Sequence, residues 1–120
     1  MKLAHTMIRV KDLDATLDFY TNFVGLKELQ RKPIGDEATL IFLSDDEENY
    51  VIELTVNHGT RDYELGNQFG HLAFFTDDLG RVIDEVKKRD WWYRESRPEL
   101  NSKYIFLKDP NGYDIEILEH

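Results

Sequence analysis

Residues 50–54 read YVIEL and residues 113–117 read YDIEI, so one short pattern occurs twice in a chain of 120 residues. Each copy has the alternation of a β-strand, in which successive side chains point to opposite faces, and each sets a glutamate between aliphatic neighbours. A carboxylate in such a place costs free energy unless it stays in water, finds a polar partner or binds a metal ion. The question is therefore what Glu53 and Glu116 contact.

Other patterns recur at nearly the same offset. The triplet IFL stands at residues 41–43 and again at 105–107, and the strand pattern that opens each half has an early histidine, His5 or His71. Nearly constant offsets indicate a duplicated β-α-β-β-β unit. The expected fold class is α+β.

This duplication predicts one domain over residues 1–120, built from modules at about 1–57 and 68–120, because one module alone is marginally stable. Apolar residues at helical spacing predict a helix between Asp12, its N-cap, and Gly25, and a second helix that begins near Leu79. Strand patterns occur in the openings of the two halves, within 3–13 and 69–79, and at 26–30, 39–43, 50–56, 91–95, 103–107 and 113–118.

Acidic residues outnumber basic ones 24 to 15, which gives a formal charge of −9. This field repels nucleic-acid phosphates and anionic membranes, so neither is an expected partner, and an anionic substrate would need local cations. The chain has no cysteine, which excludes disulfides, thiolate nucleophiles and thiolate metal ligands and fits a reducing compartment. No apolar run reaches the ~18 residues of a membrane span. We expect a cytoplasmic protein.

One histidine and one glutamate recur in each half, in equivalent strands. Taken singly, each would be read as a solvated or hydrogen-bonded strand residue. A pseudo-twofold relation between the halves would bring all four into one cluster of two imidazoles and two carboxylates. Such a set suits an octahedral divalent ion with two positions left for water or substrate. The candidate metal ligands are His5, Glu53, His71 and Glu116.

Three stretches carry a resemblance that covers almost the whole chain: LAHTMIRVKDLDATLDFYTNFVGLK, VIELTVNHGTRDYELGNQFGHLAF and FLKDPNGYDIEILE. They resemble the glyoxalase I (lactoylglutathione lyase) family in its short bacterial form, within the vicinal oxygen chelate superfamily. The resemblance implies two modules that form an open barrel across a homodimer. It also implies that the four candidate ligands form sites shared between chains, with nickel or cobalt as the usual ion and zinc in the longer forms.

The reaction that the resemblance implies is isomerisation of the hemithioacetal of methylglyoxal and a thiol, usually glutathione, to S-D-lactoyl-thiol, which detoxifies methylglyoxal. The divalent ion would stabilise the enediolate as a Lewis acid. Glu116 is the base by the family's assignment, while Glu53 would serve the other hand of the racemic substrate or return the proton. Arg9, on the face of His5, would contact the γ-glutamyl end together with Asn57.

The chain departs from the family at residues 94–104, where the usual Lys-Gly-Gly loop is missing. Arg94, Arg97 or Lys103 would have to replace its contact with the glycine carboxylate, or else are surface charges, so the identity of the thiol stays open.

Other members of the superfamily provide the alternatives: an epimerase, a thiol transferase, a dioxygenase, or a metal-free binding module. A full carboxylate at Glu53 favours the glyoxalase over the three enzymes, and retention of all four ligands disfavours the binding module.

Overall fold

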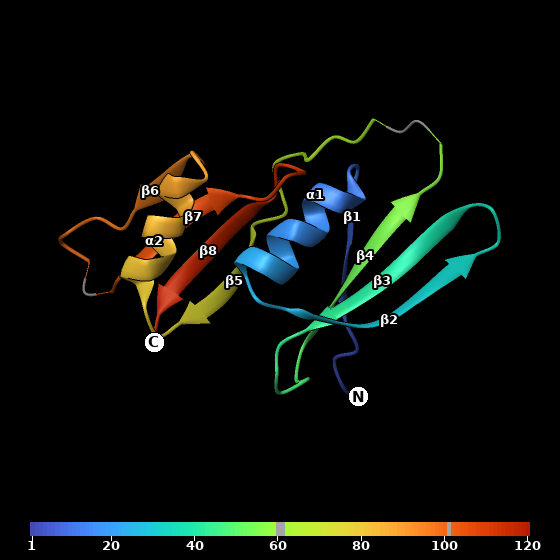
Figure 1. Ribbon diagram of the computed structural model, residues 1–120, viewed down its shortest axis with the longest axis horizontal. Helices are drawn as coiled ribbons and strands as arrows, with labels where there is room; N and C mark the ends of the chain where they lie inside the picture. The colour runs from blue at the N-terminus through green and yellow to red at the C-terminus, as the bar shows by residue number, and fades with distance from the viewer. Residues whose placement is uncertain (60–61, 101) are drawn as a thin grey trace. The chain divides into compact units, whose positions relative to one another are not determined.

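The computed structural model describes residues 1–59, 62–100 and 102–120, and the chain divides into two compact units, Met1–Tyr63 and Glu64–His120 (Figure 1). Both units have the same order of elements, one strand, a helical segment and three strands, as the repeats predicted. The first unit contains β1 (Thr6–Arg9), α1 (Leu13–Leu17), the π-helical η1 (Asp18–Phe23), β2 (Lys27–Ile34), β3 (Ala38–Ser44) and β4 (Val51–Asn57). The second contains β5 (His71–Thr76), α2 (Leu79–Lys88), β6 (Tyr93–Glu95), β7 (Tyr104–Lys108) and β8 (Asp114–Glu119).

Each unit folds into a four-stranded mixed sheet, with strand orders β1-β4-β3-β2 and β5-β8-β7-β6. In each sheet the first and last strands of the unit pair in parallel, and the other neighbours are antiparallel. The α+β class is therefore confirmed. The parallel pair matters most for the site. It sets β1, which begins just after His5, beside the strand of Glu53, and β5, which begins at His71, beside the strand of Glu116.

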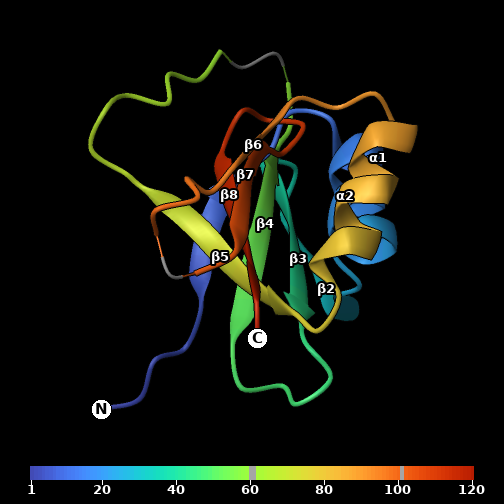
Figure 2. The ribbon, with the colours of Figure 1, turned by 90° about the vertical axis from the view of Figure 1, so that its left-hand side faces the viewer.

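One face of each sheet carries the buried aliphatic residues. In the second unit α2 lies along that face of its sheet, as the two views show (Figures 1 and 2). Full burial of one such side chain stabilises the fold by about 1.5–3 kcal/mol. The fully or almost fully buried residues on these faces are Ile8, Val10, Ile41, Leu43 and Leu54 in the first unit and Ile105, Leu107, Ile115 and Ile117 in the second.

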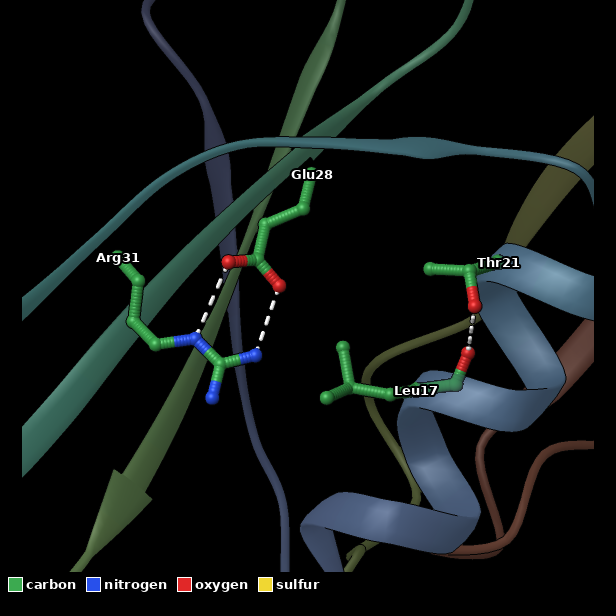
Figure 3. Close-up of polar contacts among 4 residues, drawn as sticks. All are labelled: Leu17, Thr21, Glu28 and Arg31. Atoms are coloured by element: carbon green, nitrogen blue, oxygen red, sulfur yellow. Dashed lines mark hydrogen bonds and ion pairs between the residues drawn. The ribbon is translucent and has the colours of Figure 1, made fainter.

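The helical segment of the first unit begins as predicted, since the Asp12 carboxylate accepts a hydrogen bond from the backbone N–H of Ala15 at 3.1 Å. The segment was expected to be one α-helix, but from Asp18 it continues as a π-helix. Within it the Thr21 hydroxyl donates to the carbonyl of Leu17 at 2.6 Å (Figure 3). Such back-bonding from threonine bends helices, and a π segment widens the turn.

The edge strand β2 is longer than the predicted residues 26–30 and is exposed along its whole length. Arg31 donates to both carboxylate oxygens of Glu28, with Nη2–Oε1 at 2.7 Å and Nε–Oε2 at 3.1 Å (Figure 3). This hydrogen bond raises the pKa of Arg31 above its ordinary value. Charged side chains and Pro33 on an edge strand discourage pairing with other chains.

A tight turn at Pro110-Asn111-Gly112 joins β7 to β8. The buried Asp109 carboxylate accepts hydrogen bonds from the backbone N–H groups of Asn111 and Tyr113 at 2.8 and 2.9 Å. Gly112 has φ +94°, and a Cβ atom there would lie 3.0 Å from Leu65, so the turn requires glycine. This tight turn determines where β8 begins and therefore where Glu116 lies in the sheet.

Candidate metal centre

Each unit brings its own histidine and glutamate together. In the first unit Met7 pairs with Glu53 across β1 and β4, and His5, two residues earlier and just before the strand, points back to the same acid. The distance between His5 Nε2 and Glu53 Oε1 is 3.3 Å. We call this pair the first half-site.

The second unit repeats this arrangement. Ala73 pairs with Glu116 across β5 and β8, and His71, again two residues earlier, is the first residue of its strand. His71 Nε2 lies 3.0 Å from Glu116 Oε2. We call this pair the second half-site.

A phenylalanine stands beside each imidazole. The rings of His5 and Phe42 meet edge to face, with centroids 5.7 Å apart and an interplanar angle of 80°. His71 and Phe106 do the same at 5.0 Å and 89°. Both phenylalanines occupy the register position next to their glutamate. Edge-to-face packing is the favoured geometry and orients the imidazole ring.

The spacing of the donor atoms fits a divalent metal ion. Two ligands bound at about 2.1 Å lie about 3.0 Å apart in an octahedral site and about 3.4 Å apart in a tetrahedral one. The 3.0 and 3.3 Å of the half-sites match two adjacent ligands. Among the described residues of one chain, no group of three or more His, Asp or Glu side chains is arranged to hold an ion. Each half-site therefore offers two ligands.

The two acids differ in their surroundings. Glu53 is buried, with 8% of its surface exposed, and its Oε2 accepts a hydrogen bond from the Thr55 hydroxyl at 2.5 Å. Glu116 is less buried, and Leu118 stands at the register position that Thr55 occupies in the first unit. In the described parts of the chain, His71 is the polar partner of the Glu116 carboxylate. One acid is thus held from two sides and the other from one.

The two predicted substrate contacts both lie in the first unit, on the face of the first half-site. Arg9 pairs with Thr55 in register and donates to the sulfur of Met7 at 3.6 Å. Asn57 ends β4, and its side-chain oxygen accepts a hydrogen bond from the Tyr63 hydroxyl at 3.1 Å. The side-chain amide of Asn57 also has two N–H donors, which suit an acceptor such as a carboxylate.

Arg94, Arg97 and Lys103, from the segment 94–104 in which the chain departs from the family, lie in different surroundings. The Arg94 guanidinium lies over the ring of Phe106, 4.9 Å from its centroid, in the row of the sheet that contains Glu116. Arg97 and Lys103 have side chains 71% and 80% exposed, and each lies near a surface glutamate. Only Arg94 of these three shares the face of the second half-site.

Sequence reasoning missed the side chains that hold the predicted ones in place. Thr55 was recognised as sharing a face with Glu53, but its hydrogen bond was not expected. The phenylalanines were read as strand residues, although the repeated IFL triplet marked them. Tyr63 lies in the connecting segment, where spacing gives no signal.

Comparison with known proteins identifies the family. A family model described as the Glyoxalase/Bleomycin resistance protein/Dioxygenase superfamily matches residues 2–117. A Synechocystis sp. protein named "Probable lactoylglutathione lyase" is 43% identical, with 99% of this chain and 95% of that protein covered. The "Lactoylglutathione lyase" of Neisseria meningitidis serogroup A is 39% identical, covering 99% of this chain and 91% of that protein.

Solved structures give the same result. The glyoxalase I of Leishmania major, described as trypanothione-dependent, has a TM-score of 0.82 at 35% identity and covers 96% of this chain and 84% of that one. Zea mays glyoxalase I has a TM-score of 0.86 at 30% identity over 99% of this chain and 44% of that one. The resemblance noted in the sequence is confirmed: the chain belongs to the Glyoxalase/Bleomycin resistance protein/Dioxygenase superfamily, and its glyoxalase I members are similar to it along nearly its full length.

Proposed function

We propose that the protein is a metal-dependent glyoxalase I, a lactoylglutathione lyase that isomerises the hemithioacetal of methylglyoxal and glutathione to S-D-lactoylglutathione. The observation that carries the proposal is the paired arrangement of one imidazole and one carboxylate in equivalent positions of both units. The similarity to curated lactoylglutathione lyases along nearly the whole chain supports it. The absence of cysteine fits action in the cytoplasm.

In this proposal His5, Glu53, His71 and Glu116 are the ligands of one divalent ion. Two imidazole nitrogens and two carboxylate oxygens suit nickel or cobalt, and zinc is the third candidate. When bound, the ion acts as a Lewis acid that lowers the energy of negative charge on the substrate oxygens.

Each complete site combines the first half-site of one chain with the second half-site of another, so that a homodimer has two identical sites. The support for this arrangement is the similarity of the chain, along nearly its whole length, to the glyoxalase I family, whose resemblance implies sites shared between chains. A twofold interface places the same pair of surfaces against each other twice, which produces two sites from one contact.

Glu116 is the base. It removes the proton from C1 of the hemithioacetal and delivers it to C2, while the hydroxyl proton passes from the oxygen on C1 to the oxygen on C2. No atom is gained or lost, so the step is an isomerisation. A positioned base of this kind contributes about 10²–10⁴-fold to the rate. Glu53 lies on the opposite side of the substrate and serves the other hand of the hemithioacetal or the return of the proton.

Arg9 and Asn57 bind the carboxylate of the γ-glutamyl end, because a net charge of −9 otherwise repels an anionic substrate. Arg94 replaces the Lys-Gly-Gly loop as the cation for the glycine carboxylate. The support for this role is that the Arg94 guanidinium lies over the ring of Phe106. The cation–π contact orients the guanidinium and leaves its N–H groups available for a carboxylate.

The test is an isomerase assay on metal-stripped protein that is refilled with nickel, cobalt or zinc. Each form is given methylglyoxal with glutathione, and also with trypanothione, since a relative depends on that thiol. We expect the nickel and cobalt forms to turn over fastest and to release the D-lactoyl product. An ion-loaded protein that isomerises none of these hemithioacetals would contradict the proposal.

A further inference from the structure

The two half-sites share the imidazole, the acid and the neighbouring phenylalanine, but they differ at the residue two positions beyond the acid. In the first, the Thr55 hydroxyl donates to Glu53 Oε2 at 2.5 Å. In the second, the equivalent residue is Leu118, which has no hydroxyl. The register confirms the equivalence, because Thr55 pairs with Leu40 and Leu118 with Tyr104, each two residues beyond the glutamate and on its face.

This difference constrains one carboxylate more than the other. A hydroxyl that donates to a carboxylate forms a charge-assisted hydrogen bond, which is stronger than one between neutral groups. Thr55 is itself buried, with 6% of its surface exposed, so water does not compete well for its hydroxyl. Both oxygens of Glu53 thus have a polar partner, since Oε2 accepts from Thr55 and Oε1 faces His5. Glu116 has one polar partner among the described residues, His71 at Oε2, which leaves its Oε1 without one.

A base that moves a proton between two carbon atoms has to reorient while it does so, whereas a permanent ligand has to stay in place. We propose that Thr55 is the positioning residue that makes the two acids unequal: it restrains Glu53 as a metal ligand and so leaves Glu116 as the freer acid, which takes the proton from C1. The inference rests on the proposed function for its catalytic half, while its effect on Glu53 concerns ion binding alone.

Two matched pairs of variants test this division. T55V replaces the hydroxyl by a methyl group of nearly equal volume that strands accept well, and T55S keeps the hydroxyl. L118T adds a hydroxyl beside Glu116, and L118V has the same branched shape without it. Each protein is checked for its fold by circular dichroism, and nickel affinity is then measured by calorimetry on the metal-free form.

We expect T55V to bind nickel about 10-fold more weakly than the parent, because Glu53 then loses one of its two polar partners, and T55S to restore most of the affinity. We expect L118T to lower kcat about 10-fold relative to L118V, with little change in KM, because the new hydroxyl restrains Glu116.

Equal nickel affinity in T55V and the parent, together with equal kcat in L118T and L118V, would overturn the inference and leave Thr55 as a packed strand residue. Should T55V fold poorly, the L118T and L118V pair decides the question by itself. A parent that binds nickel but isomerises no hemithioacetal would contradict the proposed function instead, and the affinity of T55V would still test the role of Thr55 toward Glu53.

Discussion

The two units of this chain repeat one plan, and the first and second half-sites are its most similar parts. Both place an imidazole nitrogen near 3 Å from a carboxylate oxygen, and both set a phenylalanine edge-on to the imidazole. They differ in what else holds the acid, since Thr55 reaches Glu53 and Leu118 cannot reach Glu116 in that way. A duplicated scaffold thus keeps the same imidazole–carboxylate geometry in both copies, while the contacts of the two acids differ.

The largest expected effects, on kcat and on nickel affinity, come from replacing each of the two acids by its amide. We expect E116Q to keep its fold and its ion, since the amide oxygen can still coordinate a metal. Its kcat should fall by about 10²–10⁴-fold with the loss of the base. E53Q should lose less turnover and more nickel affinity. Steady-state kinetics and nickel content of both variants check this, and an E116Q protein that turns over like the parent would show that the base is elsewhere.

Mixing two inactive proteins tests whether the half-sites of different chains combine. A chain with H5A and E53A lacks the first half-site, and a chain with H71A and E116A lacks the second. If sites are shared in a homodimer, each mixed dimer contains one intact site, and a 1:1 mixture should regain about a quarter of the parent activity. The measurement is the assay before and after the subunits exchange. A mixture as inactive as its components would contradict sharing between chains.

A basic residue on the face of a half-site should contribute more to substrate binding than a basic residue elsewhere on the surface. We expect R94M to raise KM by about 10-fold with little change in kcat, because it removes a charge-assisted contact to a substrate carboxylate. R97M is the matched control, since Arg97 is exposed and lies 3.7 Å from Glu99. Equal KM values for the two variants would place the glycine-end contact at other residues.

The smallest effect concerns the helix of the second unit. Arg89 donates to Glu85 at 2.8 Å, and this hydrogen bond lowers the pKa of Glu85. Because the folded-state pKa is the lower one, the pair stabilises the fold above the unfolded pKa near 4.5 and ceases to do so as the pH falls through the folded value. E85Q should therefore melt slightly lower than the parent at pH 7, and this difference should shrink as the pH is lowered. A difference that stays the same at low pH would show a packing effect.

Much of the site could be predicted from the sequence because it depends on strand alternation. The glutamates at the centre of YVIEL and YDIEI, and the histidines at a near-constant offset, needed only the two-residue period and the repeat to be placed on one face. The N-cap at Asp12 follows an equally local rule and is confirmed.

Other features depend on contacts that spacing does not encode. From Asp18 the backbone hydrogen bonds follow the π-helical rather than the α-helical pattern. The spacing of apolar residues is similar in both helices and does not predict which pattern forms. Strand β2 continues beyond the predicted residues 26–30 and through Pro33, since an edge strand tolerates proline and charged residues. The hydrogen bond of Thr55 required a particular rotamer, and the boundaries of the modules within one domain stay a prediction.

The central claim is that one first half-site and one second half-site hold a single ion. The most direct measurement is a crystal structure of the nickel-loaded protein, with data collected at the nickel absorption edge to identify the ion. The account predicts one nickel per chain, with His5 and Glu53 of one protomer and His71 and Glu116 of its partner as the protein ligands at about 2.1 Å. A nickel ion bound at other residues, or at one half-site alone, would contradict it.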